Sequence, residues 1–104
     1  MTARLIAVYR KPDDPDTFDT HYNDVHIPLA QKMPGIRRVE VHRARKALIG
    51  DDDNYIVTVM HFDDLASLEA AAGSEEGMAA GKDAYKLSGG TVKLFVAECE
   101  EVQV

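Results

Sequence analysis

The chain has 104 residues, of which 12 are Lys or Arg and 18 are Asp or Glu, and its formal net charge is −6 at pH 7. This length has room for one domain, residues 1–104, with one modest hydrophobic core. A negative charge of this size repels nucleic acid and anionic membranes, so we expect neither as a partner. The basic run Arg37–Lys46 does not change this expectation, because its charges alternate along a predicted strand without interleaved aromatic residues.

The rest of the composition narrows the class of protein further. Cys99 is the only cysteine, which excludes an internal disulfide and a cysteine-rich zinc site. The apolar stretch Leu5–Tyr9 is too short for a signal-peptide core or a membrane span, and we therefore expect a cytoplasmic protein. No glycine spacing matches a nucleotide-binding loop, and no local cluster of side chains has metal-ligand spacing. The expected cofactor is none, and the expected metal is none.

The first two elements differ in their periodicity. Residues 4–11 are rich in β-branched and apolar side chains and predict a strand. Asp14 and Pro15 then have the pattern of a helix start, and Pro34-Gly35 that of a helix end. Between them apolar residues recur at helical spacing, which predicts one buried stripe made of Phe18, Tyr22, Val25, Leu29 and Met33.

A proline lies inside this predicted helix. Pro28 lacks a backbone N–H, so the carbonyl of Asp24 loses its helical partner. We therefore expect a kink or a break near His26.

The second half of the chain adds three strands and a two-part helical segment. Residues 36–45 alternate apolar and charged side chains, as an edge strand does, and a loop follows at residues 50–54. Residues 55–62 are the strongest strand signal. Asp63 is the expected cap of a short helix that Gly73-Ser74 interrupts, and a weaker helix continues to Leu87. Residues 91–98 form the last predicted strand.

The order β-α-β-β-α-β predicts an α+β, ferredoxin-like fold with both helical segments on one face of an antiparallel sheet. Neither the third nor the last predicted strand has a clean polar face, although a solvated sheet face should be polar. Because the helices cover only one face, a second copy of the sheet is the simplest cover for the other. We therefore expect a homodimer that contacts through its sheet faces and forms a dimeric α+β barrel.

The residues around the first predicted helix carry a resemblance. They are Tyr9-Arg10 at a strand end, Phe18, Tyr22, His26, Pro28, Leu29 and the Pro34-Gly35 stop. Over about residues 5 to 41 the chain resembles the EthD family, named for ethyl tert-butyl ether degradation, within the dimeric α+β barrel superfamily. The resemblance implies a dimer with a pocket beside the first helix of each subunit. Superfamily relatives include muconolactone isomerases, cofactor-free monooxygenases, polyketide cyclases and haem-handling enzymes, so the fold alone does not choose a reaction.

His26 and Tyr22 are the candidate catalytic residues, because four positions on a helix place their side chains next to each other. An imidazole and a phenol at the end of an apolar pocket are suited to proton transfer and to polarising an oxygen. The alternative is that His26 only satisfies a free carbonyl near the proline. His21 is five positions from His26, which in an α-helix puts it off the same face, and Asp24 also points elsewhere.

Three further residues are candidates for ligand binding: Tyr9, Phe18 and His61. His61 lines the pocket if its face of the third strand meets the first helix, and lies in the interface if that face meets a partner subunit. Tyr9 has the same ambiguity on the first strand. No nucleophile and no second carboxylate aimed at His26 is evident from the sequence.

Two functions are compatible with these residues. The first is a cofactor-free enzyme, of the isomerase, cyclase or monooxygenase kind, that acts on an aromatic, lactone or polyketide-like compound by His-mediated proton transfer. The second is a non-catalytic protein that binds a small hydrophobic molecule or serves as an accessory protein of a catabolic pathway.

Overall fold

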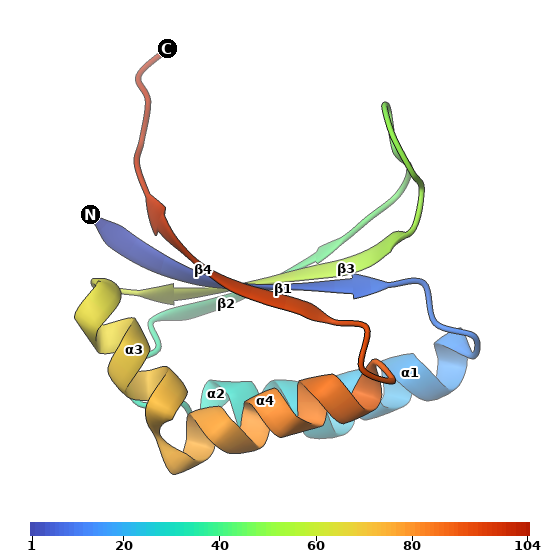
Figure 1. Ribbon diagram of the computed structural model, residues 1–104, viewed down its shortest axis with the longest axis horizontal. Coiled ribbons are helices and arrows are strands. Elements are labelled where there is room, and N and C mark those ends of the chain that lie inside the picture. The colour runs from blue at the N-terminus through green and yellow to red at the C-terminus, as the bar shows by residue number, and fades with distance from the viewer.

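A four-stranded antiparallel sheet in the order β2-β3-β1-β4 is the scaffold of the computed structural model, which describes residues 1–104. Figure 1 shows the helices gathered on one face of this sheet, with the other face uncovered. In chain order the elements are β1 (Thr2–Arg10), α1 (Pro15–His21), the π-helical turn η1 (Tyr22–His26), α2 (Ile27–Gln31), β2 (Arg38–Arg43), β3 (Asn54–Phe62), α3 (Leu65–Gly73), α4 (Glu75–Leu87) and β4 (Lys93–Cys99). The predicted ferredoxin-like α+β topology is confirmed, and the basic strand β2 is an edge strand as expected.

The two faces of the sheet differ because strand residues alternate in direction. In β1 the residues at odd positions from Ala3 to Tyr9 are buried under the helices, and those at even positions are half-buried on the uncovered face. The same alternation in β3 buries Ile56, Thr58, Met60 and Phe62 beneath the helices. His61 therefore lies on the uncovered face of the sheet. The sequence had left open whether its side chain faces the helices or the opposite side.

The first helical segment begins as predicted, with the Asp14 side chain accepting a hydrogen bond from the Thr17 N–H and Pro15 in the first helical turn. Near His26 the regular α-helix is interrupted, also as predicted. The interruption is a π-turn in which the Ile27 N–H donates to the Tyr22 carbonyl, five residues back. Pro28, just beyond this turn, has no N–H with which to restore the α-helical bond.

The π-turn changes which side chains face the core. Val25 was expected in the buried stripe, but its exposed fraction is 42%. His26 and Ala30 are buried instead, because the extra residue in the turn rotates the residues around it about the helix axis, while Leu29 is half-buried and Met33 is buried as expected. The prediction for Val25 was wrong since it assumed a uniform α-helical period.

The start of α3 also differs by one residue from expectation, whereas the corner between α3 and α4 does not. Asp64, and not Asp63, caps α3 by accepting from the Ser67 N–H, because Asp63 forms a salt bridge with Arg37. Ser74 caps α4, so the break predicted at Gly73-Ser74 is confirmed.

Two segments extend beyond the uncovered face of the sheet. Figure 1 shows the β2–β3 loop and the C-terminal segment rising on the side opposite to the helices. The loop carries Leu48 and Ile49, whose exposed fractions are 88% and 96%. None of the helices combines the length and the apolar character that crossing a membrane requires.

Candidate functional site

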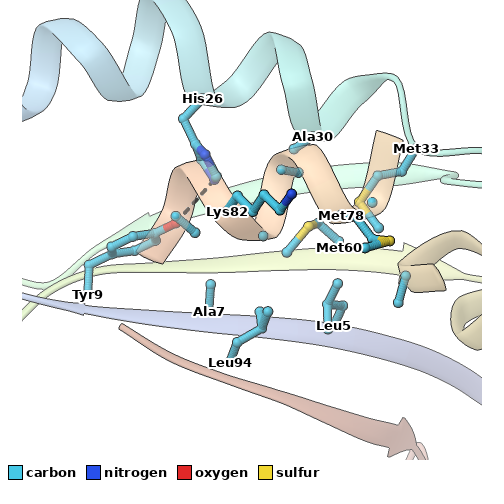
Figure 2. Close-up of a pocket in the computed structure, with 15 residues that line it drawn as sticks. Leu5, Ala7, Tyr9, His26, Ala30, Met33, Met60, Met78, Lys82 and Leu94 are labelled. Carbon is cyan, nitrogen blue, oxygen red and sulfur yellow. Dashed lines mark hydrogen bonds between the residues drawn. The ribbon is translucent and has the colours of Figure 1, made fainter. Parts of the chain in front are cut away.

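A pocket of about 260 Å³ lies between the sheet and helix α4. Figure 2 shows side chains from β1, α4 and the first helical segment around it. Of its 15 lining residues 11 are hydrophobic: they include Leu5 and Ala7 of β1, Met33, Met60, Met78 and Leu94. The polar side-chain groups of the lining are those of Tyr9, His26 and Lys82. The pocket is therefore an apolar space with few polar groups, as small-molecule sites are.

Tyr9 and His26 are joined by a hydrogen bond within this pocket. The Tyr9 hydroxyl lies 3.1 Å from the His26 Nε2 atom, and both residues are buried, His26 with an exposed fraction of 5%. Tyr9 comes from the helix-facing side of β1 and His26 from the end of the π-turn. The dashed line in Figure 2 marks this contact. The bond joins an imidazole to a phenol, but the phenol is Tyr9 and not the neighbouring Tyr22.

The other ring nitrogen of His26 is held by a carboxylate that sequence reasoning missed. Asp83 Oδ2 on α4 lies 2.9 Å from His26 Nδ1. The second oxygen of the same carboxylate, Oδ1, lies 2.8 Å from His21 Nε2. Asp83 therefore accepts from two imidazoles at once. No local pattern signals this residue, because it lies 57 positions from His26 in the chain and on another helix.

The π-turn explains why His21 and His26 meet at one carboxylate. In an α-helix residues five apart point in different directions, and the sequence analysis separated the two histidines on that ground. In the π-turn a hydrogen-bonded turn takes five residues, so positions i and i+5 lie close to the same face. The prediction that His21 lies off the His26 face was wrong for this reason.

The hydrogen bonds define how the protons are arranged. An ionised Asp83 only accepts, so both imidazoles donate to it, and neutral His26 keeps its Nε2 lone pair for the Tyr9 O–H. Burial lowers the pKa of His26, although the Asp83 carboxylate opposes this by favouring the imidazolium. Burial, together with the nearby Tyr22 and Asp83, raises the pKa of Tyr9 well above its ordinary value. At neutral pH the pair is therefore a neutral base beside a protonated phenol.

Comparison with known proteins identifies the family. The family model of the EthD domain matches residues 10–90. The chain belongs to the EthD family. A protein of Bacillus halodurans, whose crystal structure describes it as an ethyl tert-butyl ether degradation (EthD) family protein, is 39% identical and has a TM-score of 0.90, covering 96% of this chain and 100% of that one. A Rhodococcus erythropolis protein described as an uncharacterised 11.0 kDa protein is 32% identical over 96 residues, which is 91% of this chain and 93% of that protein.

Solved structures that are more distant share the fold. SnoaB, a cofactor-independent oxygenase from Streptomyces nogalater, is 16% identical with a TM-score of 0.66, and the match covers 97% of this chain and 94% of SnoaB. A protein of unknown function from Bacteroides fragilis, described as dimeric and ferredoxin-like, is 19% identical with a TM-score of 0.64, covering 94% of this chain and 96% of that one.

In this EthD protein Tyr22 and Phe18 lie behind the Tyr9–His26 pair and are not part of the pocket lining. The Tyr22 ring stacks on the His26 ring with 5.5 Å between centroids, and its hydroxyl bonds to Thr58. Phe18 stacks on Tyr22 at 5.9 Å and meets the edge of the Tyr9 ring at 5.6 Å. Both residues thus support the pair through aromatic contacts, which fix ring orientations.

His61 is the remaining candidate, and it is far from this arrangement. It lies on the uncovered face of the EthD sheet, where its Nε2 is 2.9 Å from Glu40 Oε1. The structure contains no group of three or more His, Cys, Asp or Glu side chains arranged to hold a metal ion.

Proposed function

We propose that this EthD protein binds a small, largely apolar molecule in the pocket beside α4 and moves a proton from an oxygen of that molecule. The observation that carries the proposal is the hydrogen-bonded chain Tyr9–His26–Asp83, which begins at the pocket and ends at a carboxylate. A base that is desolvated, neutral and oriented by a second group is the usual arrangement for general acid–base catalysis.

The proton route follows from the direction of each hydrogen bond. A ligand O–H donates to the Tyr9 oxygen, while the Tyr9 proton moves to His26 Nε2. Tyr9 ends as a phenol again, which suits its raised pKa, and the ligand keeps the electron pair of the broken O–H bond. The positive charge rests on the His26 imidazolium, beside the Asp83 carboxylate at 2.9 Å. The lining around the resulting anion is mainly apolar, so its attraction to the imidazolium is stronger there than in water.

The fold shared with SnoaB, described as a cofactor-independent oxygenase, supports an enzymatic reading in which ligand deprotonation starts the chemistry. The second candidate is a protein that holds the same ligand without converting it. The observation that favours this alternative is that the polar groups of the pocket, Tyr9, His26 and Lys82, include no serine, cysteine or carboxylate that could form a covalent intermediate.

Titration of the protein with phenols, and with simple quinones and lactones that lack an O–H as comparison, followed by histidine NMR signals, tests the proposal. A ligand of the right class shifts the His26 signals and not those of exposed His42. Tyr9→Phe weakens its binding about tenfold and His26→Ala weakens it further, because each removes a buried hydrogen-bonding group. His42→Ala is the matched control and binds as the wild type does.

Mass spectrometry of the same mixtures separates the two candidate functions. A product that forms with the wild type and disappears with Tyr9→Phe and His26→Ala supports the enzyme. Binding without any product supports the holding protein. The proposal is contradicted if no compound of the panel shifts the His26 NMR signals and if His26→Ala binds these compounds as the wild type does.

We also propose that the protein works as a homodimer through the uncovered sheet face. Ile6 pairs with Val59 and Phe95, and Val8 pairs with Val57, so these five apolar side chains form one continuous patch. Such patches on small proteins are typical of interaction surfaces. The fold that the chain shares with a Bacteroides fragilis protein described as dimeric supports the same arrangement.

A further inference from the structure

Lys82 is the one polar side chain of the pocket to which the proton route gives no role. It is the only lysine or arginine among the 15 residues that line the pocket. Its side chain is exposed, and in Figure 2 it extends from α4 along the pocket. An ammonium on a flexible stem at the opening of an apolar pocket attracts and orients an anion.

No carboxylate of the protein occupies this ammonium. Asp83, its neighbour in the chain, instead accepts from His21 and His26. The salt bridges of the structure pair Arg10, Lys11, Arg37, Arg38 and Arg43 with carboxylates, and Lys82 is not among them. Because the whole chain has a net charge of −6, an anionic ligand needs a local positive charge to approach this surface.

The apolar part of the pocket limits the size and the shape of the ligand. Its volume of about 260 Å³ exceeds that of a cavity that takes up benzene, about 150 Å³, but leaves room for little more than one substituted ring. Met33, Met60 and Met78 line it, and thioether sulfurs make favourable contacts with aromatic rings. The volume and the methionine-rich lining of the pocket are suited to a flat molecule with one ring.

We infer that the ligand is a one-ring aromatic acid, with a hydroxyl directed at Tyr9 and His26 and a carboxylate held by Lys82. The inference rests on the proposed function, since it assigns the ligand class of the same pocket. Lys82 then determines specificity: it selects the acid over an uncharged analogue and takes no part in proton transfer.

The test compares 3-hydroxybenzoate and 4-hydroxybenzoate with their methyl esters, which keep the ring and the hydroxyl but lose the charge. Binding is measured by calorimetry and by the His26 NMR signals. We expect the wild type to prefer one acid over its ester by about tenfold, which is the effect of one charge-assisted hydrogen bond. Lys82→Met keeps the length of the side chain and removes this preference. Lys86→Met, one turn along α4 and outside the pocket lining, retains it.

The outcomes separate the inference from the proposed function. If the esters bind as tightly as the acids, or if Lys82→Met keeps the preference for the acid, the assignment of Lys82 is wrong. In that case an ester that shifts the His26 signals still supports the proposed function. If neither acids nor esters bind or shift His26, one-ring hydroxyl compounds are not ligands and both proposals lose their support. Circular dichroism of each variant verifies that the fold is retained.

Discussion

Asp83 connects two imidazoles that differ in their surroundings. His26 is buried, whereas the side chain of His21 has an exposed fraction of 38%. His26 donates to the Asp83 carboxylate at 2.9 Å and His21 at 2.8 Å. The carboxylate that orients the buried His26 ring is therefore also bound by the partly exposed His21. A carboxylate in this position selects one tautomer of the imidazole and stabilises its protonated form. Burial lowers the pKa of His26, and Asp83 on α4 opposes that effect, so the basicity of His26 depends on both its burial and α4.

The lowered pKa of His26 makes stability depend on pH in a defined direction. In the unfolded chain His26 titrates near its ordinary value of 6.5, and in the folded protein at a lower pH. Above about pH 6.5 the imidazole is neutral in both states, and its full contribution to stability is present. As the pH falls below 6.5 the unfolded chain takes up the proton first, so the free energy of unfolding decreases until the folded pKa is passed.

Urea unfolding at pH 8, 7, 6 and 5 measures this dependence. In His26→Phe, which cannot titrate at this position, the decrease between pH 7 and pH 5 is smaller than in the wild type. The exposed His42→Phe keeps the decrease of the wild type. Equal decreases in all three proteins would show that His26 does not titrate below its ordinary value.

At the scale of elements, two interruptions of helical regularity build the site. The π-turn Tyr22–His26 brings His21 and His26 to one face, and the corner at Ser74 sets the direction in which α4 approaches them. Gly77, near the start of α4, lies against the end of α3. A Cβ built there is 2.0 Å from the Ala71 carbonyl oxygen and 2.8 Å from that of Ala72. The two helices therefore approach each other so closely at position 77 that only glycine, which has no Cβ, fits there.

Gly77→Ala is expected to lower the free energy of unfolding by about 2 kcal/mol or more, because backbone must move to admit the methyl group. Gly81→Ala, one turn later, is the matched control, since a Cβ there meets nothing within 4 Å. In that helical position alanine is expected to raise the free energy of unfolding by about 0.5–1 kcal/mol. Thermal and urea unfolding distinguish the two, and a Gly77→Ala protein as stable as the wild type would contradict the close approach.

At the scale of the molecule, the sheet separates the pocket from an apolar patch on its other face. Its helix face supports the pocket, and its other face carries the apolar patch of Ile6, Val8, Val57, Val59 and Phe95. The loop with Leu48 and Ile49 rises beside that patch (Figure 1), where a second sheet would meet it. In a two-fold symmetric dimer both subunits contribute the same patch, so a substitution in the patch changes the contact at two places.

Ile6→Lys is expected to weaken the proposed homodimer by about a hundredfold, because its cross-strand neighbours Val59 and Phe95 are apolar and the contact then buries two unpaired charges. Sedimentation or light scattering at micromolar concentration measures the change from dimer to monomer. Ala79→Lys, exposed on α4, is the control and remains dimeric. A wild-type protein that is a stable monomer at this concentration contradicts the homodimer itself.

The sequence by itself determined the order and type of the elements, because hydrophobic periodicity and helix caps are local. The cap at Asp14, the break at Gly73-Ser74 and the disturbance near His26 all depend on residues a few positions apart. The candidate His26 was found for the same reason, since it follows Tyr22 by four positions on a predicted helix and Pro28 lies two residues later.

Only the tertiary structure decided what His26 contacts. Asp83 and Tyr9 lie 57 and 17 positions away in the chain, and no periodicity connects residues on different elements. The face of His61 depends on the side of the sheet that the helices cover, which strand alternation alone leaves open. The π-turn exchanged Val25 for His26 in the buried stripe, because one extra residue in a turn redirects the side chains in and just after it, while Met33 stays buried as predicted.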